Sequence, residues 1–97
     1  MAVPFKAPVK DITFGYEVID SYNILNKISE FSDFSEDIVI PTMEECAKFS
    51  EEVLAPINAI GDQQGATIDN GVVKMPQEFV DAYKKFAEAG WASISLP

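Results

Sequence analysis

The residues that could carry chemistry in this sequence are mainly carboxylates, because it contains no histidine. Histidine is the usual general base near neutral pH and the commonest zinc ligand, so a metal site would have to use carboxylates alone. Two adjacent pairs, Glu44 with Glu45 and Glu51 with Glu52, fall in one helical stretch. Neighbouring residues on a helix point about 100° apart and do not readily share a proton or a metal ion. We therefore predict a charged surface, with Lys48 forming ion pairs to Glu44, Glu51 and Glu52.

The single cysteine and three aromatic residues near the C-terminus are the other candidates. Cys46 falls on the apolar stripe of the same helical stretch, with no histidine or basic cluster near it. This position favours a packed, unreactive thiol over a nucleophile. Tyr83, Phe86 and Trp91 could line an apolar pocket, but a stripe at helical spacing is more often part of the core.

The glycine-containing stretch 61–71 matches neither a phosphate loop nor a calcium loop. Its glycines lack the preceding strand, the following helix and the Lys-Ser or Lys-Thr pair that phosphate loops use. The segment DQQGATIDNG lacks the ligand spacing of a calcium loop. Both stretches are predicted to be turns. We therefore predict no catalytic, cofactor-binding or metal-binding residue in this chain.

The N-terminal third is expected to contain an arm and one helix. Residues 1–15 are predicted to form an extended arm, because Pro4 and Pro8 restrict themselves and their preceding residues to extended geometry. From residue 16 to about 29, apolar residues recur every three or four positions, which predicts a first helix.

The linker after this helix contains three residues with expected roles. Phe31 and Phe34 are predicted to fill the gap between helices. Ser35 is predicted as the N-cap of the next helix, because its hydroxyl can accept from otherwise unpaired amides.

A long amphipathic helix is predicted over residues 37–60. Pro41 is expected in its first turn or at its true start. Pro56 lies in its interior and should kink it near Ala55, because proline removes a backbone hydrogen bond and collides with the preceding turn. The apolar stripe of this helix comprises Val39, Met43, Cys46, Phe49, Val53, Ile57 and Ile60.

The C-terminal third is expected to contain a hairpin and a last helix. Asn70 and Gly71 tolerate positive φ, which predicts a two-residue turn in a short β-hairpin over about residues 67–75. A helix is predicted over about residues 76–89, with a proline in its first turn and Gly90 after its end. The uncharged, apolar tail WASISLP is expected to be an edge left by truncation or a surface that meets a partner.

These elements predict a mainly α fold, a small helical bundle with an extended N-terminal arm and a short hairpin. The chain has 97 residues and a net charge of -9, and 47% of its residues are hydrophobic. The charge argues against nucleic acid and membrane surfaces as partners. A lone cysteine and the absence of a signal sequence favour the cytoplasm. A chain this short has a thin core, so we expect self-association or a partner to cover its apolar surface.

Two stretches, KFSEEVLAPINAIGDQQG and NGVVKMPQEFVDAYKKFAEAGWASISLP, resemble the beginning of acyl-CoA dehydrogenases. In that family an Ala-Pro segment ends a helix, an acidic residue follows, and a proline opens a helix that leads to a Gly-hydrophobic pair. The extended arm, the extra first helix and the hairpin resemble the subgroup that includes the 3-methylmercaptopropionyl-CoA dehydrogenases. The matching residues are Ala55, Pro56, Asp62, Pro76, Gly90 and Trp91.

The resemblance implies that residues 16–97 are an incomplete N-terminal helical domain of a larger enzyme. Such an enzyme uses FAD to remove two hydrogens across the α,β-carbons of an acyl-CoA thioester. The resemblance places FAD and the catalytic glutamate in later domains, so this segment is expected to bind no cofactor and to be inactive alone. Its expected role is to pack on the remaining domains and support the acyl-binding side.

A second hypothesis is a free-standing helical module that binds another protein or itself through its apolar tail and aromatic faces. A small independent enzyme is poorly supported, because no nucleophile, base and orienting group can be assembled from these residues.

Overall fold

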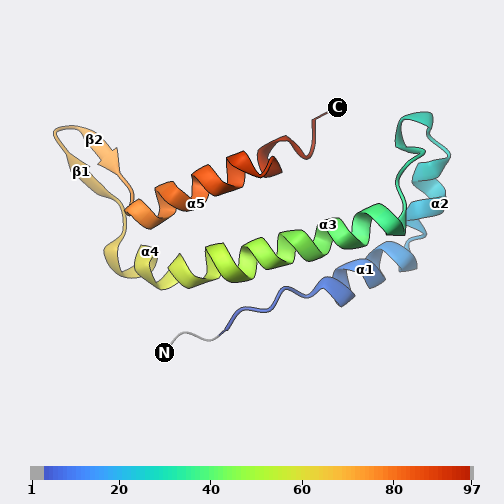
Figure 1. Ribbon diagram of the computed structural model, residues 1–97, viewed down its shortest axis with the longest axis horizontal. Coiled ribbons are helices and arrows are strands. Elements are labelled where there is room, and N and C mark those ends of the chain that lie inside the picture. Colours follow the sequence, from blue (N-terminus) through green and yellow to red (C-terminus); the bar gives the residue numbers. More distant parts are fainter. Residues whose placement is uncertain (1–3, 97) are drawn as a thin grey trace. The chain divides into compact units, whose positions relative to one another are not determined.

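The computed structural model describes residues 4–96, and the predictions made for residues 1–3 and 97 lie outside the described residues. The described chain is mainly helical, with one two-stranded antiparallel sheet (Figure 1). It divides into two compact units, whose described parts are residues 4–51 and 52–96. The predicted mainly α fold with a short hairpin is confirmed.

The N-terminal arm is shorter than predicted. Helix α1 (Val9–Val18) occupies much of the stretch 1–15 that was expected to be extended. Pro8 is its N-cap with φ of -81°, and the Pro8 carbonyl accepts a hydrogen bond from the amide of Ile12 at 3.0 Å. A proline at a helix start costs little, because the first amides of a helix have no partner within the helix. The prolines therefore end the arm and do not prevent the helix.

The single helix predicted over residues 16–29 is wrong, because two helices share this stretch. Helix α1 ends at Val18, and α2 (Ser21–Asn26) begins after Asp20, which has φ of +57°. Aspartate tolerates this left-handed conformation better than most residues. The Asp20 carboxylate also accepts a hydrogen bond from the side-chain amide of Asn23 at 2.8 Å. A short 3-10 helix, Ser29–Phe31, follows.

Helix α3 (Glu36–Phe49) begins after Ser35, as predicted, but the capping interaction differs. Ser35 is extended and its hydroxyl makes no capping hydrogen bond. Its backbone carbonyl accepts from the amide of Val39 at 2.9 Å. Pro41 lies inside the helix, so the prediction that it marks the first turn or the start is wrong.

The helical stretch continues beyond α3 with other hydrogen-bond patterns. A π-helix, Ser50–Leu54, is followed by a 3-10 helix, Ala55–Ile57, and then by α4 (Asn58–Gln64). Pro56 has no amide hydrogen, so it cannot donate a hydrogen bond to the preceding turn. A kink was predicted near Ala55, and the structure shows a change in helix type around the proline there.

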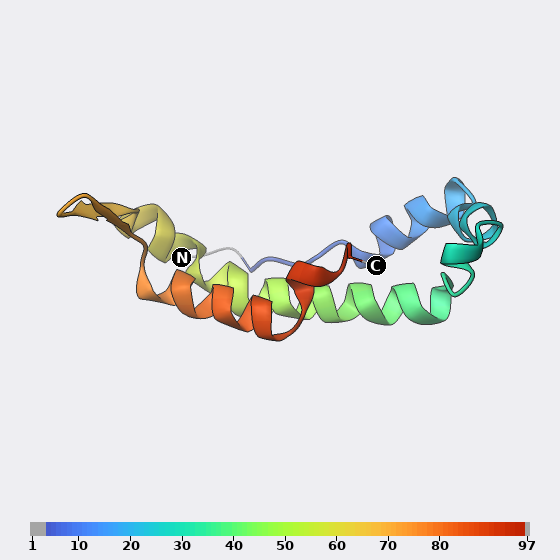
Figure 2. The same ribbon diagram turned by 90° about the horizontal axis from the view of Figure 1, so that it is seen from above.

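The hairpin matches the prediction. Strands β1 (Thr67–Asp69) and β2 (Val72–Lys74) are antiparallel, with Ile68 opposite Val73. Asn70 and Gly71 form the turn with φ of +50° and +78°. In Figures 1 and 2 the hairpin extends away from α4 and α5, and every residue of both strands is exposed.

The last long helix lies where it was predicted, although Pro76 is its N-cap and not part of its first turn. Helix α5 (Gln77–Glu88) follows Pro76, and Gly90 has the left-handed φ of +84° that suits a glycine after a helix. The tail then forms a 3-10 helix, Trp91–Ser93, and Ile94 is exposed.

The centre of the unit 4–51 is a cluster of three aromatic rings, Tyr16, Tyr22 and Phe34. Their centroids are 6.3 Å apart for Tyr16 and Tyr22, 6.2 Å for Tyr16 and Phe34, and 5.2 Å for Tyr22 and Phe34. The rings come from α1, α2 and the linker before α3, so this aromatic cluster joins three segments. The prediction that Phe34 fills a gap between helices agrees with this packing, whereas Phe31 is exposed.

Few of the described residues are buried. The buried residues between positions 4 and 96 are Ser21, Val39, Ala47, Pro76 and Ala82. Many large apolar side chains stay exposed in both units. The core is thin, as predicted from chain length.

Candidate functional site

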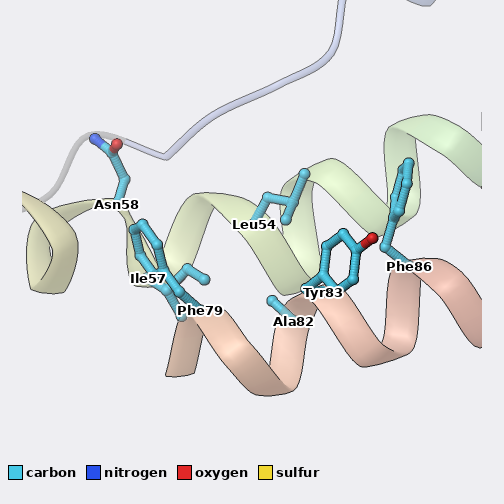
Figure 3. Close-up of a pocket in the computed structure, with 7 residues that line it drawn as sticks. All are labelled: Leu54, Ile57, Asn58, Phe79, Ala82, Tyr83 and Phe86. Carbon is cyan, nitrogen blue, oxygen red and sulfur yellow. The ribbon is translucent and has the colours of Figure 1, made fainter. Parts of the chain in front are cut away.

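A groove in the unit 52–96 is the best candidate for a functional site. One wall comes from the helical turns that surround Pro56, and the other comes from α5 (Figure 3). The hairpin connects these two segments and lets α5 return beside the first wall. Its tight Asn70-Gly71 turn reverses the chain within a few residues.

The groove has a volume of about 300 Å³ and is almost entirely apolar. No charged side chain lines it, and the amide of Asn58 is its one strongly polar side-chain group besides the Tyr83 hydroxyl. The rings of Tyr83 and Phe86 are stacked, with centroids 6.4 Å apart. The lining residues are Leu54, Ile57, Asn58, Phe79, Ala82, Tyr83 and Phe86.

The close approach of α4 and α5 depends on Gly61. A Cβ atom at this position would overlap the ring of Phe79 on α5. Gly61 lies inside α4 and does not end it, whereas Gly65, with φ of +64°, is the C-cap. The absent side chain therefore makes room for the Phe79 ring, which also lines the groove.

A second hollow, of about 260 Å³, lies between the same two segments and shares Ile57 and Ala82 with the groove. Three carboxylates and one ammonium group surround it: Glu52, Glu78, Asp81 and Lys85. No ion pair within 4.0 Å joins Lys85 to these carboxylates. The surroundings of the groove are therefore acidic, while its lining is uncharged.

The predicted ion pairs of Lys48 are not formed. Within residues 4–96 the ion pairs are Lys6 with Glu51 at 3.5 Å and Lys74 with Asp69 at 3.2 Å. The Lys6 side chain is largely exposed, so water screens its attraction to Glu51 and the pair contributes little stability. The extended residues before α1 bring Lys6 to Glu51, and a helix-periodicity argument could not anticipate this contact.

Cys46 was predicted to be packed, and this is wrong: the thiol is exposed on α3. The adjacent Ala47 is buried instead. At this turn of α3, the side that faces the rest of the unit therefore contains Ala47 and not the predicted Cys46. The described part of the chain holds no group of three or more Asp, Glu or Cys residues arranged to bind a metal ion.

The fold changes the pKa of the Tyr22 phenol. Burial within the aromatic cluster raises its pKa, and the negative charges of Glu36 and Glu17 raise the pKa further. Both effects favour the neutral phenol. The phenol of Tyr22 is therefore neutral near neutral pH.

No protein-family model matches the chain. Over 93 residues, or 96% of its length, the chain is 34% identical to a 3-methylmercaptopropionyl-CoA dehydrogenase from Ruegeria pomeroyi (strain ATCC 700808 / DSM 15171 / DSS-3). The chain is related to acyl-CoA dehydrogenases. The predicted family resemblance, including its subgroup, is thereby confirmed. The chain spans 16% of the length of that relative.

The sequence predicted only some of the residues that line the groove. Tyr83 and Phe86 line it, as the pocket hypothesis suggested, but Trp91 does not belong to the lining. The sequence pattern did not indicate Leu54 and Asn58, because the predicted apolar stripe assumes a constant α-helical period through Pro56. The π-helix and 3-10 helix change that period and place Leu54 on the groove. The proline itself was the signal that could have indicated this change.

The structure also bears on where a flavin could bind. FAD carries a pyrophosphate, which glycine-rich turns at helix N-termini and basic side chains usually hold. Here the Phe79 ring fills the space beside Gly61, so a phosphate could not approach there. Gly65 precedes a strand instead of a helix. The residues at these glycines do not fit a flavin pyrophosphate.

Within residues 4–96, no helix is both long and apolar enough to cross a membrane.

Proposed function

We propose that this chain is the N-terminal helical segment of an FAD-dependent acyl-CoA dehydrogenase. The observation that carries the proposal is the 34% identity, over nearly the whole chain, to a 3-methylmercaptopropionyl-CoA dehydrogenase. The name of the relative suggests 3-methylmercaptopropionyl-CoA as the first acyl-CoA substrate to test. The reaction of the parent enzyme is α,β-dehydrogenation, for which FAD supplies the oxidant when bound.

The role of this segment in the parent enzyme is structural. Within residues 4–96, no group of three or more Asp, Glu or Cys residues is arranged to hold a metal ion, and the Phe79 ring fills the space beside Gly61. Its apolar groove and exposed apolar side chains suit packing against the remaining domains. Those domains hold FAD and the catalytic base, and the segment supports the acyl-binding side and helps to exclude water. Location in the cytoplasm remains a prediction from the sequence.

The size and colour of the native protein test this proposal. An antibody against this segment is used to purify the protein that carries it, and its intact mass and absorbance are recorded. We expect a yellow protein several times heavier than 10.7 kDa, with bound FAD and dehydrogenase activity on the suggested acyl-CoA. A colourless native protein of about 10.7 kDa would contradict the proposal and leave the free-standing interaction module as the explanation.

The isolated chain supplies the complementary measurement. Mixed with FAD and acyl-CoA and then desalted, it should retain no flavin and reduce no electron acceptor. Bound flavin in the 97-residue chain would show that the cofactor site was assigned to the wrong part of the enzyme.

A further inference from the structure

We infer that the groove between the helical turns at Pro56 and α5 receives an apolar side chain from the part of the parent protein that lies outside residues 1–97. This inference rests on the proposed function and names the contact through which the segment joins the remaining domains. Leu54 and Tyr83 face each other across the groove and are its most exposed large side chains (Figure 3).

The first argument is the exposure of these side chains. Tyr83 is 68% exposed and Leu54 is 42% exposed, although both line a concave apolar surface. Covering apolar surface stabilises a protein by about 25 cal/mol for each Å² removed from water. A concave apolar site next to a large aromatic residue is typical of pockets that receive an anchoring side chain at an interface.

The second argument concerns the chemistry of the occupant. The lining contains no charged group, so it offers nothing to the phosphates of CoA or of a flavin. Its volume of about 300 Å³ is at the lower end of the range for small-molecule sites. An aliphatic or aromatic side chain matches both the size and the polarity of the groove.

The third argument concerns which of two occupants fills the groove: the remainder of the parent protein or a second copy of this chain. Two copies would each bring a net charge of -9. They would also bring together the acidic groups beside the groove, including Glu78 and Asp81. Like charges near one interface oppose association. The related dehydrogenase, by contrast, has most of its length outside the matched segment, so the same polypeptide can supply the occupant.

Photo-crosslinking in the full-length parent protein tests the inference. Tyr83→p-benzoylphenylalanine places a photoreactive ring in the groove, and irradiation followed by mass spectrometry maps the residue that it captures. We expect an intramolecular crosslink to an apolar residue outside 1–97. Lys84→p-benzoylphenylalanine is the control, because Lys84 is the next residue on α5 and does not line the groove. It should give at least about fivefold less of this crosslink, because adjacent helical residues point about 100° apart.

A second pair of variants tests whether the contact matters for docking. Tyr83→Asp and Lys84→Gln each change the net charge by one unit in the same direction on the same helix. In the parent protein, Tyr83→Asp should speed amide exchange in residues 79–86 by about tenfold, and Lys84→Gln by less than about twofold. Equal effects of the two variants would contradict the inference.

Two crosslinking results would overturn the inference directly. A crosslink from position 83 to residues 1–97 of another molecule would identify a second copy as the occupant. The absence of any crosslink would show that the groove is open to water. The flavin content and mass of the same sample test the proposed function separately, so a flavoprotein with an empty groove would refute only this inference.

Discussion

The aromatic cluster of the unit 4–51 and the groove of the unit 52–96 use similar residues with opposite results. In the cluster, Tyr16, Tyr22 and Phe34 pack against one another, so each ring covers part of the next. In the groove, Tyr83 stacks on Phe86 but remains 68% exposed. In both places the aromatic rings come from helices or from the segments beside them. The difference shows that rings from three segments cover one another in part, whereas two helices side by side leave a groove.

This contrast separates residues that stabilise the fold from residues available to a partner. An apolar side chain stabilises the isolated chain only to the extent that other residues of the same chain remove it from water. The cluster therefore contributes to the stability of the segment itself, and the groove contributes once a partner covers it. Substitutions in the isolated chain can test this division directly.

The largest expected effect is the loss of the cluster. Phe34→Ala should lower the free energy of unfolding of the chain by about 3 kcal/mol, because it removes a ring that contacts both tyrosines. The matched variant Tyr83→Ala should lower it by less than about 0.5 kcal/mol, because that ring is mostly in water. Urea denaturation followed by circular dichroism measures both values. Equal losses would show that the groove is as much a part of the core as the cluster.

The next effect concerns the packing of α4 on α5. Gly61→Ala should lower the free energy of unfolding by about 2 kcal/mol, because the added methyl group overlaps the Phe79 ring. Gly15→Ala is the control: nothing lies within 4 Å of its Cβ position in α1, and Gly15 is exposed. That substitution should raise the stability by about 0.5 to 1 kcal/mol, as expected for Gly to Ala in an open helix. A stabilising Gly61→Ala would place Phe79 elsewhere.

The smallest effect is a dependence on alkaline pH. The pKa of Tyr22 is raised above 10.0 in the folded chain, chiefly by burial, so folding favours the neutral phenol. This contribution to stability is complete below the unfolded pKa near 10 and is lost as pH rises through the higher folded pKa. Tyr22→Phe, which cannot ionise, should remove that part of the alkaline loss. Thermal denaturation of both proteins across this pH range gives the comparison, and identical pH profiles would count against the assigned burial.

Local sequence signals predicted the C-terminal third of the fold well. The Asn70-Gly71 turn, Pro76 before α5 and Gly90 after it each restrict the backbone within one or two residues. Such signals need no knowledge of the rest of the chain. The hairpin and α5 accordingly lie where the sequence indicated.

The remaining features depend on contacts between segments or on departures from a regular helix. The break at Asp20 has no strong local signal, since aspartate is only tolerated in the left-handed region. The exposure of Cys46 reflects which side of α3 other segments cover. The position of Leu54 on the groove follows from the π-helix, which a constant period cannot represent. Pattern alone was therefore insufficient for the site, although it identified Tyr83 and Phe86.

The fit of the Phe79 ring over Gly61 also has an evolutionary consequence. A position that must remain without a side chain tolerates substitution only when the ring opposite becomes smaller. In related enzymes we expect glycine at position 61 to accompany an aromatic residue at position 79, and a larger residue at 61 to accompany a small one at 79. Substitutions at positions 61 and 79 would then be correlated among the related enzymes. The correlation would identify this contact even in relatives whose sequences have otherwise diverged.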